Sequence, residues 1–509
     1  MSADPVLTLR PGQVSLAELR RIWAGEPVGL EASVWAAIDS SSASVGRILD
    51  SGRTVYGINT GFGLLAQTRI PADRLGELQR NLILSHSAGL GEALDPRIVR
   101  LMMILKAIGL GRGHSGVRRE VVERLLALVA ANALPVIPSQ GSVGASGDLA
   151  PLAHMSAILI GEGEMELDGE RMPAGDALRW LGLDPLVLGP KEGLALINGT
   201  QASTAIALDV LFTAERIFSA ALLSGAFSLD AFKGTDAAFD ARIHEARGQP
   251  GQIAVAGMLR ELLAGSEIRH SHAGCDRVQD PYSFRCQPQV MGAALDLLRH
   301  SARTLEIEAN AVSDNPLLFG DDALSGGNFH AQPVAFAADI MILALCEMGS
   351  ISERRLAVLI DPKMSGLPPF LVRDSGVNSG FMIAQVTAAA LVSENKSLAF
   401  PASVDTIPTS AGQEDHVSMA THGALKARRV AHNAAGAVGV ELLAAAQAID
   451  FHRPLKTAPT LMKAMETIRA NVPFYETDRF IGRDLEWAKA AVLDGGLSRA
   501  IDKKLFEAP

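Results

Sequence analysis

Apolar residues recur at intervals of three and four along most of the chain, the spacing that predicts helices. From about residue 190 the predicted helices become long, and several are apolar on nearly every side, which indicates burial among other helices. Five segments have no proline beyond their first turn: Glu192–Phe232, Pro288–Asn310, Gln332–Ile360, Ser379–Phe400 and Val417–Ile449. This pattern predicts a bundle of long helices, with part of its apolar surface in a subunit interface.

Strand signals are sparse. Residues 163–173 alternate between apolar and polar around Asp168-Gly169, which predicts a hairpin, and a short strand is expected near Val6–Leu9. The N-terminal part mixes shorter elements with turn-forming glycine and proline. We therefore expect a mainly α fold with a mixed N-terminal region, 1–110, and a long-helix bundle core, 111–509, without a flexible linker between them.

Composition narrows the class of protein. The chain has 509 residues, is 48% hydrophobic and 20% charged, and carries 46 basic against 56 acidic residues, a net charge of −10. This balance suits a globular protein and disfavours nucleic-acid binding, for which no basic block is present. The uncharged run from 375 to 393 contains polar side chains that lipid would leave unsatisfied, so a buried helix is expected there and no membrane span.

Cysteine usage and the N-terminus suggest the compartment. The three cysteines form no CxxC pair, and an odd number is a poor disulfide framework. The first residues, MSADPVLTLRPGQVSL, contain no apolar stretch typical of a signal peptide. A cytoplasmic protein is expected.

Six polar or glycine-rich strings interrupt the apolar background, and chemistry is expected where they occur. They are YGINTGFG (56–63), GSVGASGDLAPLAH (141–154), LINGTQAS (196–203), VQDPYSFRCQPQVMG (278–292), SGGNFHAQP (325–333) and TSAGQEDHVSM (409–419).

The string 141–154 admits several interpretations. It is compatible with an ordinary glycine-rich turn that leads into a helix opened by Asp148. A phosphate-binding loop is disfavoured because the Walker lysine is absent, and a hydrolase nucleophile elbow because the G-x-S-x-G spacing fails. A third interpretation is chemical. The amide nitrogen of Gly147 can attack the carbonyl carbon of Ala145, and loss of two waters, one from the Ser146 side chain, leaves a five-membered ring with an electrophilic methylene.

That string resembles the signature of the aromatic amino-acid ammonia-lyases, which form a methylidene-imidazolone (MIO) from Ala-Ser-Gly. Further strings resemble the histidine-directed branch of the family in its order along nearly the whole chain: YGINTGFG, LSHSAG, INGTQAS, QDPYSFRCQPQ, EANAVSDNP, GGNFHAQP, LPPFL, NSGFMIAQVTAAAL and QEDHVSM. The resemblance implies a fumarase/aspartase-like helical architecture and a homotetramer whose active sites are shared between subunits.

The resemblance also implies the reaction. We expect non-oxidative deamination of L-histidine to trans-urocanate and ammonia, the first step of histidine degradation. The cofactor would be an MIO made from Ala145, Ser146 and Gly147, with no external cofactor. The methylene carbon from Ser146 would capture the substrate amine or, in an alternative mechanism, the imidazole ring.

Residue roles follow from the same resemblance. Tyr56 is the expected general base, and Tyr282 binds and orients the substrate, although core tyrosines are common. Arg285 would hold the substrate carboxylate, with an ion pair as its alternative. Asn198 would hydrogen-bond the ring oxygen or the substrate carboxylate. Two further residues are expected to line the pocket: Gln279 and Phe329.

Substrate choice is expected to depend on His86 and on Glu414, which is also assigned to catalysis, because both can pair with an imidazole. His416, two residues after Glu414, would point elsewhere on a helix and is interpreted as structural. No compact metal-ligand spacing is present. The chain departs from the usual family pattern at Gly412 and Phe400, which puts the tuning of rate and affinity in doubt.

Three rival functions stay open at this level. The first is a lyase or aminomutase of the same chemistry that acts on tyrosine or phenylalanine, against which the pair His86 and Glu414 argues. The second is a lyase of the fumarase/aspartase class, whose GSS-x-MP-x-K-x-N loop is absent from the sequence. The third is a helical scaffold or inactive paralogue, which would have no reason to keep the chemical residues together.

Overall fold

The computed structural model describes residues 6–61, 67–272, 277–498, 501 and 503–506. Its chain forms two compact units, each assembled from three stretches of sequence. The first unit comprises Met1–Asp209, Ala302–Asp339 and Pro401–Leu425, and the second comprises Val210–Ser301, Ile340–Phe400 and Lys426–Pro509. The division expected from the sequence, 1–110 and 111–509, stays a prediction. Phe62, Gly63 and Cys275 lie outside the described residues.

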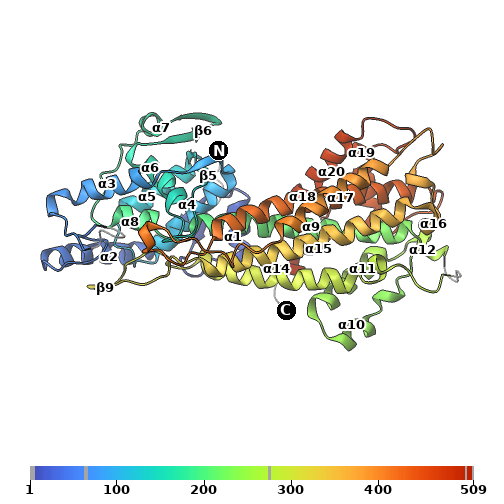
Figure 1. The fold of residues 1–509 in the computed structure, drawn as a ribbon, viewed down its shortest axis with the longest axis horizontal. Coiled ribbons are helices and arrows are strands. Elements are labelled where there is room, and N and C mark those ends of the chain that lie inside the picture. Colours follow the sequence, from blue (N-terminus) through green and yellow to red (C-terminus); the bar gives the residue numbers. More distant parts are fainter. Residues whose placement is uncertain (1–5, 62–66, 273–276, 499–500, 502, 507–509) are drawn as a thin grey trace. The chain divides into compact units, whose positions relative to one another are not determined.

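Eight α-helices lie entirely within the described residues of the first unit and are coloured blue to green in Figure 1. They are α1 (Leu16–Trp23), α2 (Val34–Asp50), α3 (Leu75–His86), α4 (Pro96–Gly111), α5 (Arg119–Ala130), α6 (Leu149–Ala157), α7 (Ala174–Trp180) and α8 (Glu192–Ile197). Helices α3, α6 and α8 pack against one another, and α4 packs against α5.

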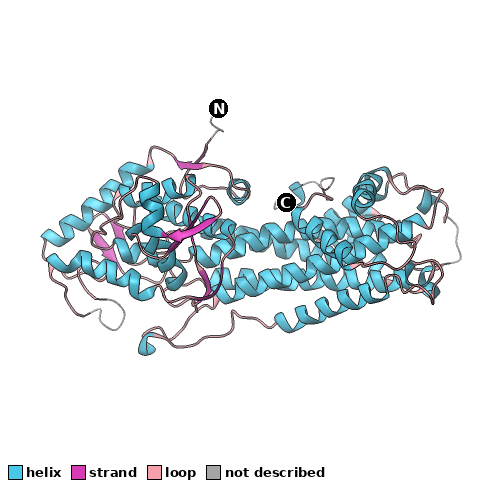
Figure 2. Cartoon of the chain, turned by 90° about the horizontal axis from the view of Figure 1, so that it is seen from above, coloured by secondary structure: helices cyan, strands magenta, loops and turns pink. Residues whose placement is uncertain are grey.

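Every strand found among the described residues is short and belongs to the first unit (Figure 2). The strands are β1 (Leu7–Leu9), β2 (Val28–Leu30), β3 (Leu90–Ala93), β4 (Leu134–Pro135), β5 (Pro138–Gln140), β6 (Glu164–Leu167), β7 (Glu170–Pro173), β8 (Leu317–Phe319) and β9 (Asp322–Leu324). Strands β1 and β2 pair in parallel, and the other pairs, β3–β5, β4–β6, β6–β7 and β8–β9, are antiparallel.

Four long helices have residues in both units: α9 (Gln201–Ala231), α14 (Gln287–Ala309), α15 (Gln332–Ile360) and α18 (Ala420–Asp450). The second unit also contains α10 (Ala241–Arg247), α11 (Pro250–Leu263), α12 (Glu267–His270), α13 (Tyr282–Arg285), α16 (Pro362–Ser365), α17 (Met382–Leu398), α19 (Pro459–Asn471) and α20 (Gly482–Asp494). The expectation of a mainly α fold is confirmed.

A buried ion pair ties long helices together inside the second unit. Arg355 of α15 donates to both carboxylate oxygens of Glu441 of α18, at 2.5 and 2.8 Å, and neither side chain is exposed. The hydroxyls of Ser228 in α9 and Ser352 in α15 donate to the same carboxylate. Because a buried charge without its partner is costly, this network favours one arrangement of the three helices.

Among the described residues, one helix, α15, is long and apolar enough to cross a membrane. However, 61% of its most apolar window is buried within the protein. A core helix of a soluble protein meets the same criteria, so α15 is weak evidence for a membrane span.

Several predicted elements match their boundaries closely. Helix α15 spans Gln332–Ile360 as predicted, and the hairpin β6–β7 turns at Asp168-Gly169, with Leu167 opposite Glu170. The single helix predicted over Glu192–Phe232 is wrong, because the chain divides there into α8 and α9. The interruption at Asn198–Thr200 is where the chain meets the glycine-rich loop.

Candidate active site

The loop 141–148 is joined to the interruption between α8 and α9 by backbone contact. Gly147 and Gly199 form an isolated parallel bridge, and the Asp148 amide donates to the Gly199 carbonyl at 2.8 Å. Gly147 has a φ of +80°, and a Cβ there would lie 2.2 Å from the Gly199 carbonyl oxygen. Only glycine fits this approach, so the two glycine-bearing strings form one structure.

The buried carboxylate of Asp148 anchors the loop to two helices, α9 and α18. Its carboxylate accepts hydrogen bonds from the Ser203 amide at 2.7 Å, the Ser203 hydroxyl at 2.9 Å and the Thr421 hydroxyl at 2.6 Å. Burial raises the pKa of this fully buried carboxyl, while these hydrogen bonds act in the opposite direction. Asp148 precedes α6, as expected, but its side chain makes no cap hydrogen bond and instead links the loop to α9 and α18.

Ser146 lies at the tip of this loop, between two polar partners. Its φ is +51°, a left-handed value that costs energy for a residue with a Cβ. The Ser146 hydroxyl donates to Glu414 Oε1 at 2.7 Å, and the Asn198 carboxamide nitrogen donates to the Ser146 carbonyl oxygen at 2.7 Å. Both the side chain and the carbonyl of Ser146 are therefore held in defined directions.

Glu414 is oriented by hydroxyl groups. Its Oε2 accepts hydrogen bonds from the hydroxyls of Thr409, at 2.8 Å, and Ser410, at 2.9 Å. Thr409 and Glu414 also pair as an antiparallel bridge. Since Glu414 and His416 lie outside any helix, the expectation that His416 points elsewhere on a helix is wrong, and His416 lines the same cavity.

His86, the last residue of α3, has a defined tautomer. Its Nδ1 lies 2.8 Å from the Leu82 carbonyl oxygen, which can only accept, so Nδ1 carries the proton. Burial lowers the pKa of His86, although the Leu82 hydrogen bond and the charge of Glu414 act to raise it. The neutral ring therefore presents Nε2 as a hydrogen-bond acceptor.

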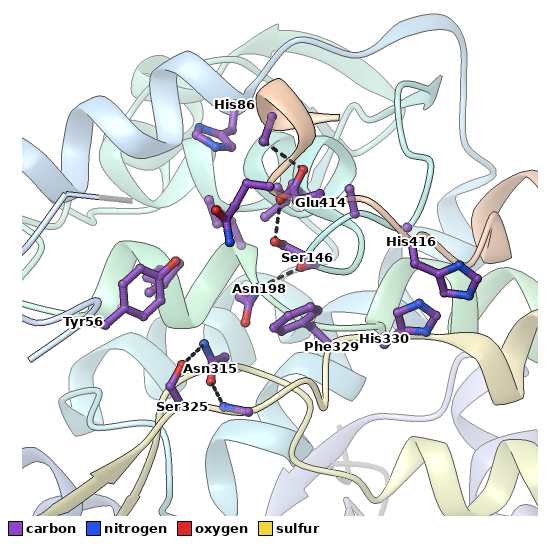
Figure 3. Close-up of a pocket in the computed structure, with 18 of the residues that line it drawn as sticks. Tyr56, His86, Ser146, Asn198, Asn315, Ser325, Phe329, His330, Glu414 and His416 are labelled. Atoms are coloured by element: carbon purple, nitrogen blue, oxygen red, sulfur yellow. Dashed lines mark hydrogen bonds between the residues drawn. The ribbon is translucent and has the colours of Figure 1, made fainter. Parts of the chain in front are cut away.

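These side chains line a cavity of about 810 Å³ in the first unit (Figure 3). Tyr56 and Phe329 lie on its wall with Ser146 and Asn198. The cavity thus brings together seven of the residues predicted from the sequence: Tyr56, His86, Ala145, Ser146, Asn198, Phe329 and Glu414.

Sequence reasoning missed another part of the wall. Asn315 holds the segment that leads to Phe329, because its amide donates to Ser325 at 3.1 Å and its carbonyl oxygen accepts from the Gly326 amide at 2.6 Å. His330 stacks on His416, with ring centroids 5.6 Å apart and planes 9° from parallel. The strings SDNP and GGNFHAQP resemble family motifs, but nothing in them predicts the hydrogen bonds of Asn315 or the stacking of His330 on His416.

Gly147 lies in the first unit behind the cavity wall, and the other predicted residues lie in the second unit. Tyr282 and Arg285 share the short helix α13, with the guanidinium carbon 4.4 Å from the tyrosine ring centroid. The Tyr282 side chain is 72% exposed. Gln279 precedes them and is also exposed. Their roles toward a substrate stay predictions.

Comparison with known proteins identifies the group to which this site belongs. A family model for aromatic amino acid lyases matches residues 14–470. The chain belongs to the aromatic amino acid lyase family. It is 58% identical over 508 residues to a histidine ammonia-lyase of Paracidovorax citrulli, covering 98% of this chain and 99% of the relative. The family resemblance stated from the sequence is confirmed.

Two solved structures have the same fold as this chain. A histidine ammonia-lyase from Trypanosoma cruzi is 39% identical, with a TM-score of 0.90 over 98% of this chain and 97% of that one. A tyrosine aminomutase from Streptomyces globisporus is 36% identical, with a TM-score of 0.92 over 98% of both chains. A histidine ammonia-lyase and a tyrosine aminomutase thus resemble this chain almost equally in fold. The fold alone therefore does not identify the substrate.

The aromatic amino acid lyases are MIO-dependent, and residues 145–147 fit such a ring. Gly147 has no Cβ to obstruct its own amide nitrogen, and the Gly199 carbonyl leaves no space for one. The Ser146 carbonyl oxygen, which ring closure retains, already accepts a hydrogen bond from Asn198. The Ser146 hydroxyl, which leaves as water, contacts a carboxylate.

Proposed function

We propose that this chain is an ammonia-lyase that converts L-histidine to trans-urocanate and ammonia, the first step of histidine degradation. The observation that carries the proposal is Ser146, held between Glu414 and Asn198 on the wall of a cavity that also contains His86. The 58% identity to a histidine ammonia-lyase over nearly the full length supports the same substrate.

The electrophile is proposed to come from the chain itself. The Gly147 amide nitrogen bonds to the Ala145 carbonyl carbon, whose oxygen leaves as water, and loss of the Ser146 hydroxyl as a second water leaves the methylene. Such an MIO, with its carbonyl oxygen held by Asn198, would supply an electrophilic carbon toward the substrate amine. The hydrogen bond from Ser146 to Glu414 supports a role for this carboxyl in the second water loss.

Removal of the Cβ proton is assigned to Tyr56. The substrate loses this proton and its α-amine, and a Cα–Cβ double bond forms. Tyr56 lies on the cavity wall and is half-buried. A positioned acid–base group contributes on the order of 10²–10⁴-fold to such a step, which is the scale of the effect assigned to its hydroxyl.

Selectivity for histidine is assigned to His86 and Glu414. The neutral His86 ring offers Nε2 as an acceptor, which suits the N–H of a substrate imidazole. Loss of the Ser146 hydroxyl removes one hydrogen-bond donor from Glu414 Oε1, leaving that oxygen available to the substrate. The two N–H donors of a protonated substrate imidazole would satisfy both acceptors. A phenyl ring would satisfy neither, and each buried unsatisfied group costs about 1–3 kcal/mol.

We infer that the active form is a cytoplasmic homotetramer with shared active sites. All residues that line the cavity belong to the first unit, whereas Tyr282, Arg285 and Gln279 belong to the second. The exposure of Tyr282 is compatible with its donation to a site in a neighbouring subunit. There Arg285 would hold the substrate carboxylate through two parallel hydrogen bonds.

The substrate assignment is tested by kcat/KM on three amino acids, with product identified by mass. Purified protein should release trans-urocanate and ammonia in equal amounts from L-histidine. Its kcat/KM for L-tyrosine and L-phenylalanine should be at least about tenfold lower, because two unpaired polar groups together cost about 2 kcal/mol or more and ~1.4 kcal/mol corresponds to tenfold. A preference for tyrosine or phenylalanine, or conversion to a β-amino acid, would contradict the proposal and favour the aminomutase alternative.

A further inference from the structure

Helix α4 carries one lysine in an otherwise apolar, buried stretch. Thirteen residues of α4 are buried, and Lys106 is the charged one among them, with 1% of its surface exposed. Burying an ammonium group costs several kcal/mol unless hydrogen bonds and charges compensate it. Its partners therefore indicate what the lysine stabilises.

Those partners are main-chain carbonyls beside the active site. Lys106 Nζ donates to the carbonyl oxygen of Asn198 at 2.8 Å and to that of Ala195 at 3.2 Å. Both oxygens lie at the C-terminal end of α8, where a helix leaves carbonyls without partners. The ammonium thus fixes the backbone at the interruption between α8 and α9.

The same interruption orients Asn198 toward the reacting loop. Its carboxamide nitrogen donates to the Ser146 carbonyl oxygen at 2.7 Å, and the residue is 3% exposed. A hydrogen bond to this carbonyl would draw electron density from the methylene conjugated with it. A shift of the Asn198 backbone by a few tenths of an ångström would weaken this hydrogen bond, whose strength depends steeply on geometry.

We propose that Lys106 is a positioning residue for the reaction: through the carbonyl oxygens of Ala195 and Asn198, it holds the Asn198 carboxamide on the carbonyl of Ser146. This inference rests on the proposed function. Nothing in the sequence analysis pointed to Lys106, although a single charge inside an apolar helix is the signal that would have found it.

The charge environment gives the inference a pH dependence. Burial lowers the pKa of Lys106 to about 7, Asp314 and Asp148 act to raise it, and Lys191 acts to lower it further. The folded protein therefore holds the cation below about pH 7 and loses it as pH rises through that value. Since an ammonium is a stronger donor than an amine, the contribution of Lys106 is largest below pH 7.

The test follows cyanide addition to the methylene by intact mass, which requires no substrate turnover. The Lys106→Met chain should keep the mass deficit of two waters yet add cyanide at least about fivefold more slowly than wild type at pH 6. At pH 8 the ratio of the wild-type rate to the Lys106→Met rate should be smaller than at pH 6. Because both rates are measured at the same pH, the ionisation of cyanide cancels in this ratio. In an Asn198→Ala background, Lys106→Met should cause no further slowing.

Two further variants keep the test decisive. Lys106→Gln retains an N–H donor but has no titrating charge. Its cyanide addition should be slowed less than that of Lys106→Met, and the ratio of the wild-type rate to its rate should change less with pH. This variant replaces Lys106→Met in the test if the Met variant does not fold. Lys191→Met removes an equally buried lysine that pairs with Asp314, and controls for lost stability. At pH 6 its cyanide rate should match that of wild type. Because Lys191 lowers the pKa of Lys106, the loss of cyanide reactivity with rising pH should move to a higher pH in this variant and should not disappear.

Equal cyanide rates in wild type and Lys106→Met, or equal slowing in the Asn198→Ala background, would overturn the assignment of Lys106. Loss of the two-water deficit in Lys106→Met with its retention in Asn198→Ala would overturn it as well. Absence of the deficit from wild type would instead contradict the proposed function.

Discussion

Under the proposed function, the carboxylate of Glu414 would act at two stages, in formation of the cofactor and in binding of the substrate. One of its oxygens accepts from the Ser146 hydroxyl, and the other is held by Thr409 and Ser410. The held oxygen fixes the direction of the group, while the first oxygen changes partner when Ser146 loses its hydroxyl. Preorganised groups of this kind need little rearrangement during the reaction.

Replacing Glu414 by Gln tests this role. The Gln side chain can still accept from Ser146, so the two-water mass deficit should remain. Its neutral amide lacks the charge that holds the substrate imidazole, so kcat/KM for L-histidine should fall by about tenfold or more. Steady-state kinetics with intact mass checks both expectations. Asp405→Asn, an exposed carboxylate in the same segment, is the control and should retain activity. Near-normal kcat/KM for L-histidine in Glu414→Gln would contradict the role of this carboxylate in holding the imidazole.

At the scale of elements, the site depends on the interruption between α8, which ends at Ile197, and α9, which begins at Gln201. The glycines on the two sides of the contact allow the loop 141–148 to touch the chain between α8 and α9. This contact positions the Asn198 carboxamide to donate a hydrogen bond to the Ser146 carbonyl oxygen. The ends of the long helices serve as fixed supports, as is common for catalytic groups carried on loops.

Gly147→Ala should disrupt this contact. The added methyl would overlap the Gly199 carbonyl, so the loop must move and the two-water deficit should be lost, with activity reduced by about 100-fold or more. Gly169→Ala is a matched control, because Gly169 has a φ of +81° and no atom within 4 Å of the added carbon. It should cost about 1–2 kcal/mol of stability by thermal unfolding and leave the mass deficit intact. A normal deficit in Gly147→Ala would show that the loop tolerates the methyl.

The sequence predicted helices better than their interruptions. The long apolar runs gave α14, α15 and α18 to within a few residues, because burial demands continuous apolar surface. The break at Asn198–Thr200 was not predicted, since it depends on pairing with Gly147, far away in the chain. The cavity position of His416 was missed for a similar reason, because a local turn replaces the assumed helix.

At the scale of the whole molecule, the predicted site residues fall into two groups. One group lines the cavity of the first unit, and the other, with Arg285, belongs to the second unit. Sequence resemblance named both groups but could not say which chain supplies each to a given site, because that depends on assembly.

Mixed oligomers test the sharing of sites. Ser146→Ala and Arg285→Ala chains should each be nearly inactive alone. When co-expressed with distinct tags and purified as mixed oligomers, they should recover a measurable fraction of wild-type kcat, because some sites then combine an intact Ser146 with an intact Arg285. Mixed oligomers that stay inactive, or a fully active monomer in sedimentation, would contradict shared sites.

The most direct test of the central claim is the intact mass of the full chain. The account predicts a wild-type mass lower than the encoded mass by two water molecules, the loss of this deficit in Ser146→Ala, and no urocanate from L-histidine with that variant. A wild-type chain that deaminates L-histidine at its unmodified, encoded mass would contradict the claim that Ala145, Ser146 and Gly147 supply the electrophile.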